Sequence, residues 1–145
     1  MKSKLSGITV RSPVCWYLKN VPRETSPCLA LTLVESQRKR CSFLEAVVFN
    51  LALQNTRVVN ERAEEILPKP RVNVVILRAV SDIKTCLHLA VPFLVKGGKV
   101  VLKKEPENHN ALARLHDDFL LIEEFQVVGY NGKKSSLLVF KKCST

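Results

Sequence analysis

Strand-type and helix-type patterns alternate along this chain of 145 residues. Leu29–Glu35 is a short apolar run that predicts a buried strand, and from Gln37 to Leu53 the apolar residues change to a helical period. The same criteria predict strands at Arg57–Asn60, Val72–Leu77 and Lys99–Lys103, and helices at about Ser81–Leu94 and Asn108–Asp118. Because strands that alternate with helices form a mostly parallel sheet with right-handed crossovers, the pattern predicts an α/β fold in three layers.

Punctuating residues set the expected boundaries of these elements. Ser81 is expected to cap its helix, with Asp82 in the first turn, and Pro92 to kink or end the last turn. Gly97-Gly98 is expected to form the turn into the following strand, and Asn55 to mark the stop after the first helix. The apolar face expected for that first helix consists of Leu44, Val47, Val48 and Leu51.

The C-terminal part of the sequence has a different pattern. Glu124–Tyr130 and Lys133–Lys141 flank Asn131-Gly132, which predicts a β-hairpin with a tight turn. The hairpin adds an antiparallel strand to an otherwise mostly parallel sheet. This order is typical of Rossmann-like folds of the methyltransferase type.

Charge and cysteine content restrict the partners and the compartment. The formal charge of +10 favours a polyanionic partner, most commonly nucleic acid, and Arg38-Lys39-Arg40 is one of several short basic clusters. The five cysteines include no C-x-x-C pair, which argues against a disulfide framework or a structural zinc site. No apolar run approaches the ~20 residues of a membrane helix. We therefore expect a cytoplasmic protein with no membrane partner.

Ligands of doubly wound sheets lie beyond the carboxyl ends of the strands, so the residues that follow each strand are candidate binding residues. Glu35 follows the first predicted strand and can accept hydrogen bonds from both hydroxyls of a ribose, although a carboxylate there also suits a helix N-terminus. Ala63 and Glu64 follow the next strand, where they line either an adenine pocket or a solvated loop. Arg78, after a buried strand, requires an anionic partner or water.

These residues carry a family resemblance over about Pro27–Lys142. The string Leu31–Ser36 (LTLVES), followed at matching separation by Arg62–Glu65 (RAEE), Arg78–Val80 and Lys96–Gly98, resembles bacterial glucose-inhibited division protein B. That family is the small-subunit methyltransferase that acts on 16S ribosomal RNA.

The resemblance implies S-adenosylmethionine-dependent methylation of a guanine at N7, with 16S ribosomal RNA or the small ribosomal subunit as partner. By the family pattern, Glu35 lies beside the ribose of the cofactor, Ala63 and Glu64 line the adenine site, and Arg78 faces the cleft. Arg38, Lys39 and Arg40 are the candidates for holding the RNA backbone, with a solvated helix face as the alternative. No catalytic residue and no metal ligand is expected, because guanine N7 attacks with an existing lone pair.

The N-terminal segment departs from the family. Members place a glycine-rich loop about twenty residues before the TLVES string, where this chain has Ser12–Tyr17 and no glycine. Residues 1–26 are therefore expected to form a divergent segment that contributes at most a first strand, and 27–145 a methyltransferase-like domain. Three explanations stay open: a degenerate relative that no longer binds cofactor, a reshaped loop, or unrelated sequence joined to the domain.

Two rival functions remain to be weighed. A nicotinamide-dependent dehydrogenase also uses an acid after its second strand, but it requires a G-x-G-x-x-G motif that this chain lacks. A catalytically inactive RNA-binding or ribosome-associated module of the same fold is the main alternative to the active enzyme. Binding of S-adenosylmethionine distinguishes the two.

Overall fold

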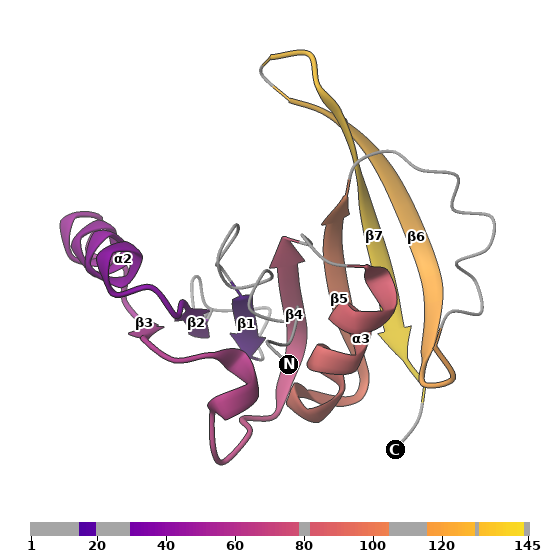
Figure 1. The fold of residues 1–145 in the computed structure, drawn as a ribbon, viewed down its shortest axis with the longest axis horizontal. Helices are drawn as coiled ribbons and strands as arrows, with labels where there is room; N and C mark the ends of the chain where they lie inside the picture. Colours follow the sequence, from indigo (N-terminus) through magenta and orange to yellow (C-terminus); the bar gives the residue numbers. More distant parts are fainter. Residues whose placement is uncertain (1–14, 20–29, 79–81, 105–115, 130, 144–145) are drawn as a thin grey trace, which may run out of the picture.

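The computed structural model of the chain describes residues 15–19, 30–78, 82–104, 116–129 and 131–143 (Figure 1). In chain order the described elements are β1 (Cys15–Lys19), β2 (Ala30–Val34), α2 (Arg38–Asn50), β3 (Thr56–Val59), η1 (Ala63–Glu65), β4 (Val72–Arg78), α3 (Ile83–Ala90), η2 (Val91–Phe93), β5 (Leu94–Lys104), β6 (Phe119–Val128) and β7 (Lys134–Lys142). The strands form one seven-stranded sheet in the order β3-β2-β1-β4-β5-β7-β6.

The predicted α/β class is confirmed. β2 is parallel to β3, β4 is parallel to β5, and helices connect the strands of each pair. α2 lies on one face of the sheet, and η1 and α3 lie on the other, which gives three layers (Figure 1). This follows from right-handed crossovers that leave the centre of the sheet in opposite directions.

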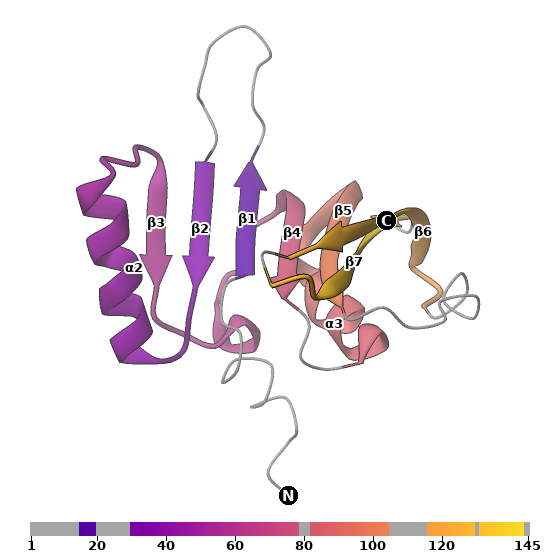
Figure 2. The ribbon, with the colours of Figure 1, turned by 90° about the horizontal axis from the view of Figure 1, so that it is seen from above.

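The central strand β1 runs against its neighbours. It pairs antiparallel with both β2 and β4, and in Figure 2 its arrow points opposite to those of β2 and β3. The connection from β1 to β2 consists of residues 20–29, which is shorter than the dozen or more residues that a parallel crossover needs. The sheet is therefore mixed at its centre as well as at its C-terminal end.

Helix α2 is confirmed, but the prediction of its buried face is wrong. Only Cys41 is buried along this helix, and Leu44, Val47 and Val48 are half-buried. Leu51, predicted on the buried face, is 64% exposed, and Phe49 is 84% exposed. Asn55, with a φ of 58°, lies in the turn to β3 rather than at the end of the helix.

Helix α3 begins one residue later than predicted. Asp82 is its N-cap and accepts hydrogen bonds from Thr85 N at 2.9 Å and Thr85 Oγ1 at 2.6 Å, whereas Ser81 lies outside the described residues. The helix ends at Ala90, and Pro92 lies in the 3₁₀ turn η2, so the prediction for Pro92 is confirmed. The helix predicted at Asn108–Asp118 falls largely outside the described residues.

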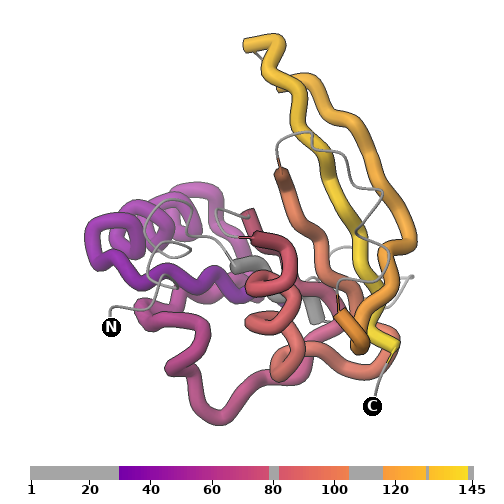
Figure 3. The backbone as a smooth tube through the Cα atoms, turned by 45° about the vertical axis from the view of Figure 1, so that its right-hand side comes forward, coloured from indigo at the N-terminus to yellow at the C-terminus, as the bar shows by residue number. Residues whose placement is uncertain are grey.

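The C-terminal hairpin is confirmed. β6 and β7 pair from Phe119 and Lys142 to Val128 and Lys134, and β7 lies between β5 and β6. Gly129 N donates to Lys133 O at 2.8 Å and closes the turn. The first strand starts at Phe119, five residues earlier than predicted, and the hairpin extends beyond the end of β5 (Figure 3).

The main core lies between the sheet and α3. Its buried members come from β2, η1, β4, α3, η2, β5, β6 and β7 and include Val75, Leu87, Phe93, Leu102, Leu138 and Phe140. Lys142 is buried as well, and its ammonium group donates to Val91 O and Leu94 O, both at 3.2 Å. The end of β7 is thereby joined to η2 and to the start of β5.

Candidate ligand-binding edge of the sheet

The register of the strands places the ends of β2, β3 and β4 along one edge of the sheet. Val34 pairs with Val59, so Glu35 and Asn60 follow their strands at the same level. Leu33 and Ile76 both pair with Trp16 of β1, which puts Glu35 level with Arg78. The residues that follow β2, β3 and β4 therefore lie along the same edge of the sheet.

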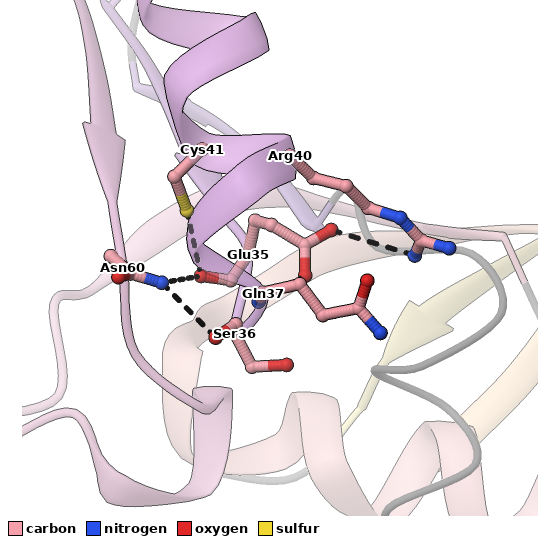
Figure 4. Close-up of polar contacts among 6 residues, drawn as sticks. All are labelled: Glu35, Ser36, Gln37, Arg40, Cys41 and Asn60. Atoms are coloured by element: carbon pink, nitrogen blue, oxygen red, sulfur yellow. Dashed lines mark hydrogen bonds and ion pairs between the residues drawn. The ribbon is translucent and has the colours of Figure 1, made fainter.

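Glu35 is the most buried polar residue at this edge, with 1% of its surface exposed. Its Oε1 accepts a hydrogen bond from Gln37 N at 2.7 Å, next to the start of α2 (Figure 4). Its backbone oxygen accepts hydrogen bonds from Cys41 Sγ at 3.1 Å and from Asn60 Nδ2 at 3.0 Å. Gln37 N thus orients the carboxylate, and the bonds from Cys41 and Asn60 hold the backbone of Glu35 in place.

The other carboxylate oxygen of Glu35 forms an ion pair with Arg40 and lacks a hydrogen bond. Oε2 is buried and has no hydrogen-bond partner among the described residues. Arg40 Nη1, which lies 3.9 Å away, is also buried and also lacks a hydrogen-bond partner there. A buried carboxylate oxygen without a hydrogen bond costs about 1–3 kcal/mol or more. Such a group in a native structure calls for an explanation, and a ligand that supplies the missing donor is one.

Cys41 and Asn60 belong to this site, and the sequence analysis missed both. Asn60 Nδ2 also donates to Ser36 O at 3.1 Å, so it joins the residues after β3 to those after β2. Asn60 directly follows β3, and the rule applied to Glu35 could have found it. Burial raises the pKa of the Cys41 thiol above 9.0, and the negative charge of Glu35 adds to the effect.

Cys41 is expected to resist alkylation in the folded protein. At pH 8, iodoacetamide should label exposed Cys143 well before Cys41, because the thiolate is the reactive form and burial disfavours it. The folded state retains a proton that the unfolded chain releases near pH 9, so the thiol should contribute stability that declines as the pH rises above that value. Site-resolved mass spectrometry tests the labelling, and equal rates at the two cysteines in the native protein would contradict it.

The two candidate adenine residues occupy different environments. Ala63 is 4% exposed and packs in the core, whereas Glu64 is exposed and lines a groove of about 530 Å³ between η1 and α3. Lys69 Nζ donates to Ala63 O at 2.8 Å and to Glu64 O at 2.7 Å, and it lies 5.0 Å from the centre of the Phe93 ring. Lys69 therefore holds η1 in place.

Replacing Lys69 by Met should loosen η1. We expect the free energy of unfolding to fall by about 1 kcal/mol, since hydrogen bonds to a charged donor are lost at a half-buried position. Lys84→Met, at an exposed position in the same groove, is the matched control and should stay within about 0.5 kcal/mol. Chemical denaturation measures both, and equal effects would show that Lys69 does not hold η1.

The remaining candidates are exposed to different degrees. Arg78 ends β4 and is exposed. In the first turn of α2, the Arg38 side chain is 72% exposed and lies 3.9 Å from Glu45, and Lys39 is exposed. Arg40 differs from both, because its side chain is 40% exposed and extends to Glu35 (Figure 4). The basic cluster is thus divided between the surface and the buried site.

Comparisons with known proteins agree with this architecture. A family model described as rRNA small subunit methyltransferase G matches residues 24–138. The ribosomal RNA small subunit methyltransferase G of Carboxydothermus hydrogenoformans is 35% identical over an alignment of 127 residues, and the match covers 80% of this chain and 54% of that protein. The chain belongs to this family. It spans about half the length of such relatives.

Solved structures of methyltransferases share the fold of this family member. The tRNA m1G37 methyltransferase of M. jannaschii has a TM-score of 0.62 at 15% identity. The match covers 79% of this chain and 38% of the chain of that enzyme. An rRNA methylase of Streptococcus thermophilus has a TM-score of 0.54 at 14% identity and covers 78% and 73%. At such low sequence identities the likeness shows the fold alone. It confirms the prediction of a Rossmann-like fold.

The family match begins after β1 and does not include that strand. Residue 24 follows that strand, and the position expected for the family's glycine-rich loop, Ser12–Tyr17, runs into it. Cys15 pairs with Val34, so this end of β1 lies at the same edge as Glu35. The chain therefore enters β1 at the candidate ligand-binding edge, whereas a parallel first strand would end there.

The described part of the chain contains no group of three or more His, Cys, Asp or Glu that could hold a metal ion. Among the helices described above, none is long and apolar enough to span a membrane.

Proposed function

We propose that this chain is a methyltransferase domain that binds S-adenosylmethionine and acts on guanine N7 of 16S ribosomal RNA. The observation that carries the proposal is the unsatisfied, buried Oε2 of Glu35 at the ligand edge of the sheet, in a chain of the rRNA small subunit methyltransferase G family. A ribose hydroxyl supplies the hydrogen bond that this oxygen lacks, and the acid stands at the point of the fold where such a hydroxyl is expected.

Different residues at this edge are assigned to different parts of the proposed cofactor. Glu35 accepts a hydrogen bond from the ribose. η1, held by Lys69, brings Ala63 and Glu64 to the adenine side, and Arg78 borders the cleft at the end of β4. The bound cofactor supplies the electrophilic methyl group. Guanine N7 carries a free lone pair, so the contribution of the protein is to position the two reactants, an effect that can reach ~7–11 kcal/mol.

The surface of α2 supports an RNA partner. Its first turn holds Arg38 and Lys39 and no acidic residue, and the N-terminus of a helix already carries partial positive charge. Basic side chains there are unfavourable unless an anion approaches, and an RNA backbone provides one. We expect Arg38→Gln and Lys39→Gln to weaken binding of a 16S RNA fragment and to reduce its dependence on salt concentration.

A thermal-shift titration tests the function. S-adenosylhomocysteine at 100 times its dissociation constant should stabilise the fold by about 2.7 kcal/mol. Adenosine serves as a second ligand because it tests the ribose and adenine contacts alone. A folded sample that does not respond to either ligand at millimolar concentration would overturn the proposal. If RNA binding persists in such a sample, the inactive RNA-binding module is the better description.

A further inference from the structure

Two buried polar atoms face each other across a gap that is too wide for a hydrogen bond. Glu35 Oε2 and Arg40 Nη1 are 3.9 Å apart, and neither has a hydrogen-bond partner among the residues that the structure describes. The Glu35 side chain is fully buried. Charge-assisted hydrogen bonds between such groups normally close to about 2.7–2.9 Å. The two atoms are therefore about 1 Å too far apart for a hydrogen bond that would satisfy both of them.

The two residues are anchored on different elements of the fold. Glu35 is fixed through Oε1 to Gln37 N at 2.7 Å and through its carbonyl oxygen to Cys41 and Asn60. Arg40 N donates to Gln37 O at 3.0 Å in the first turn of α2. The carboxylate thus approaches from a strand end, where Gln37 N orients it, and the guanidinium approaches from the first turn of α2.

The gap fits one oxygen atom that both donates and accepts. An oxygen about 2.8 Å from each atom closes a triangle on the 3.9 Å base with ordinary hydrogen-bond lengths. Glu35 offers only an acceptor and Arg40 only a donor. A hydroxyl group satisfies both at once, whereas a carbonyl oxygen or an ammonium group satisfies only one of them.

We infer that Arg40 is a ligand-binding residue that, together with Glu35, clamps one ribose hydroxyl of an adenosine-containing ligand. This rests on the proposed function, and it gives Arg40 a role different from that of its neighbours Arg38 and Lys39. The hydroxyl donates to Glu35 Oε2 and accepts from Arg40 Nη1. The clamp makes the site selective for a ribonucleoside, because an analogue without that hydroxyl leaves a buried acceptor and a buried donor unpaired.

Binding of three nucleosides to three proteins tests the inference. Adenosine, 2′-deoxyadenosine and 3′-deoxyadenosine are titrated by calorimetry into the wild type, Arg40→Gln and Arg38→Gln. The wild type should prefer adenosine to one of the two deoxy analogues by at least about 10-fold. Arg40→Gln should lose about 10-fold in adenosine affinity and bind adenosine and that analogue within about threefold of each other. Arg38→Gln, on the same helical turn, should keep the wild-type preference.

The outcomes separate this inference from the proposed function. If the wild type binds adenosine and Arg40→Gln keeps the full preference for it, or loses affinity equally for adenosine and both analogues, the clamp is wrong and the proposed function stands. If the folded wild type binds neither adenosine nor S-adenosylhomocysteine, both fail. Should Arg40→Gln not fold, Arg40→Lys replaces it. That variant keeps the charge without the planar fork and should retain affinity only in part, and wild-type affinity for all three nucleosides would overturn the clamp.

Discussion

A Glu35→Gln variant is expected to bind S-adenosylhomocysteine about 10- to 100-fold more weakly than the wild type. The substitution removes a charge-assisted hydrogen bond of about 1.5–3 kcal/mol between Oε2 and the ribose. Stability should change by less than about 1 kcal/mol, because the amide oxygen can still accept from Gln37 N and no volume is lost. Calorimetry and chemical denaturation on the same preparations measure the two effects.

The alternative role of Glu35 predicts a different result. If the carboxylate only caps the start of α2, Glu35→Gln should leave ligand affinity unchanged and lower stability through the lost interaction with the helix dipole. Glu61→Gln is the matched control, since Glu61 is an exposed acid just after the end of β3 at the same edge, and the variant should lose no more than about threefold in affinity. Equal losses in the two variants would show that the overall negative charge, and not the geometry of Glu35, is responsible.

Periodicity predicted the elements of this fold well because burial enforces it. β2, β4 and α3 lie close to their predicted positions, and each packs apolar residues into the core between the sheet and α3. α2 was predicted as a helix correctly, but its expected apolar face is only half-buried. A hydrophobic pattern identifies a face that can be buried, and which neighbour covers it is decided by the rest of the fold.

The direction of β1 could have been anticipated from chain length. Residues 20–29 separate β1 from β2, too few for the crossover that a parallel pair requires. The sequence predicted a mostly parallel sheet, and the family match that supports it begins only at residue 24. The local connection therefore decides the direction, and the family pattern applies to the sheet that follows.

The candidate site was predicted in its position and only partly in its contacts. The topological rule placed Glu35 and Arg78 at one edge, because strand ends are fixed by the order of elements. That Ala63 is buried while Glu64 is exposed, and that Arg40 turns toward Glu35 while Arg38 does not, depends on side-chain directions within single turns. Sequence spacing alone does not determine those directions.

Gly98→Ala is expected to destabilise the fold by about 1–3 kcal/mol, through a backbone clash. The glycine pair was predicted as a turn ahead of a strand, which is wrong: Gly97 and Gly98 lie inside β5. There β5 advances five residues, from Leu94 to Lys99, while β4 advances two. A Cβ atom on Gly98 would lie 2.9 Å from Val95 O and 3.1 Å from Asn73 O, and neither backbone oxygen can move without disturbing the pairing of the two strands.

Gly97 provides a control in which the physical cause is different. Its φ of +74° favours glycine, but a Cβ there would meet nothing closer than Lys141 Cε at 3.9 Å. Gly97→Ala should therefore cost about 1–2 kcal/mol from backbone conformation alone, and Gly97→Asn less, since asparagine accepts the left-handed region. Gly98→Asn should be at least as damaging as Gly98→Ala, because asparagine does not relieve a steric clash. Chemical denaturation of the four variants tests this, and a Gly98→Asn protein as stable as the wild type would rule out close packing of Gly98 against β4.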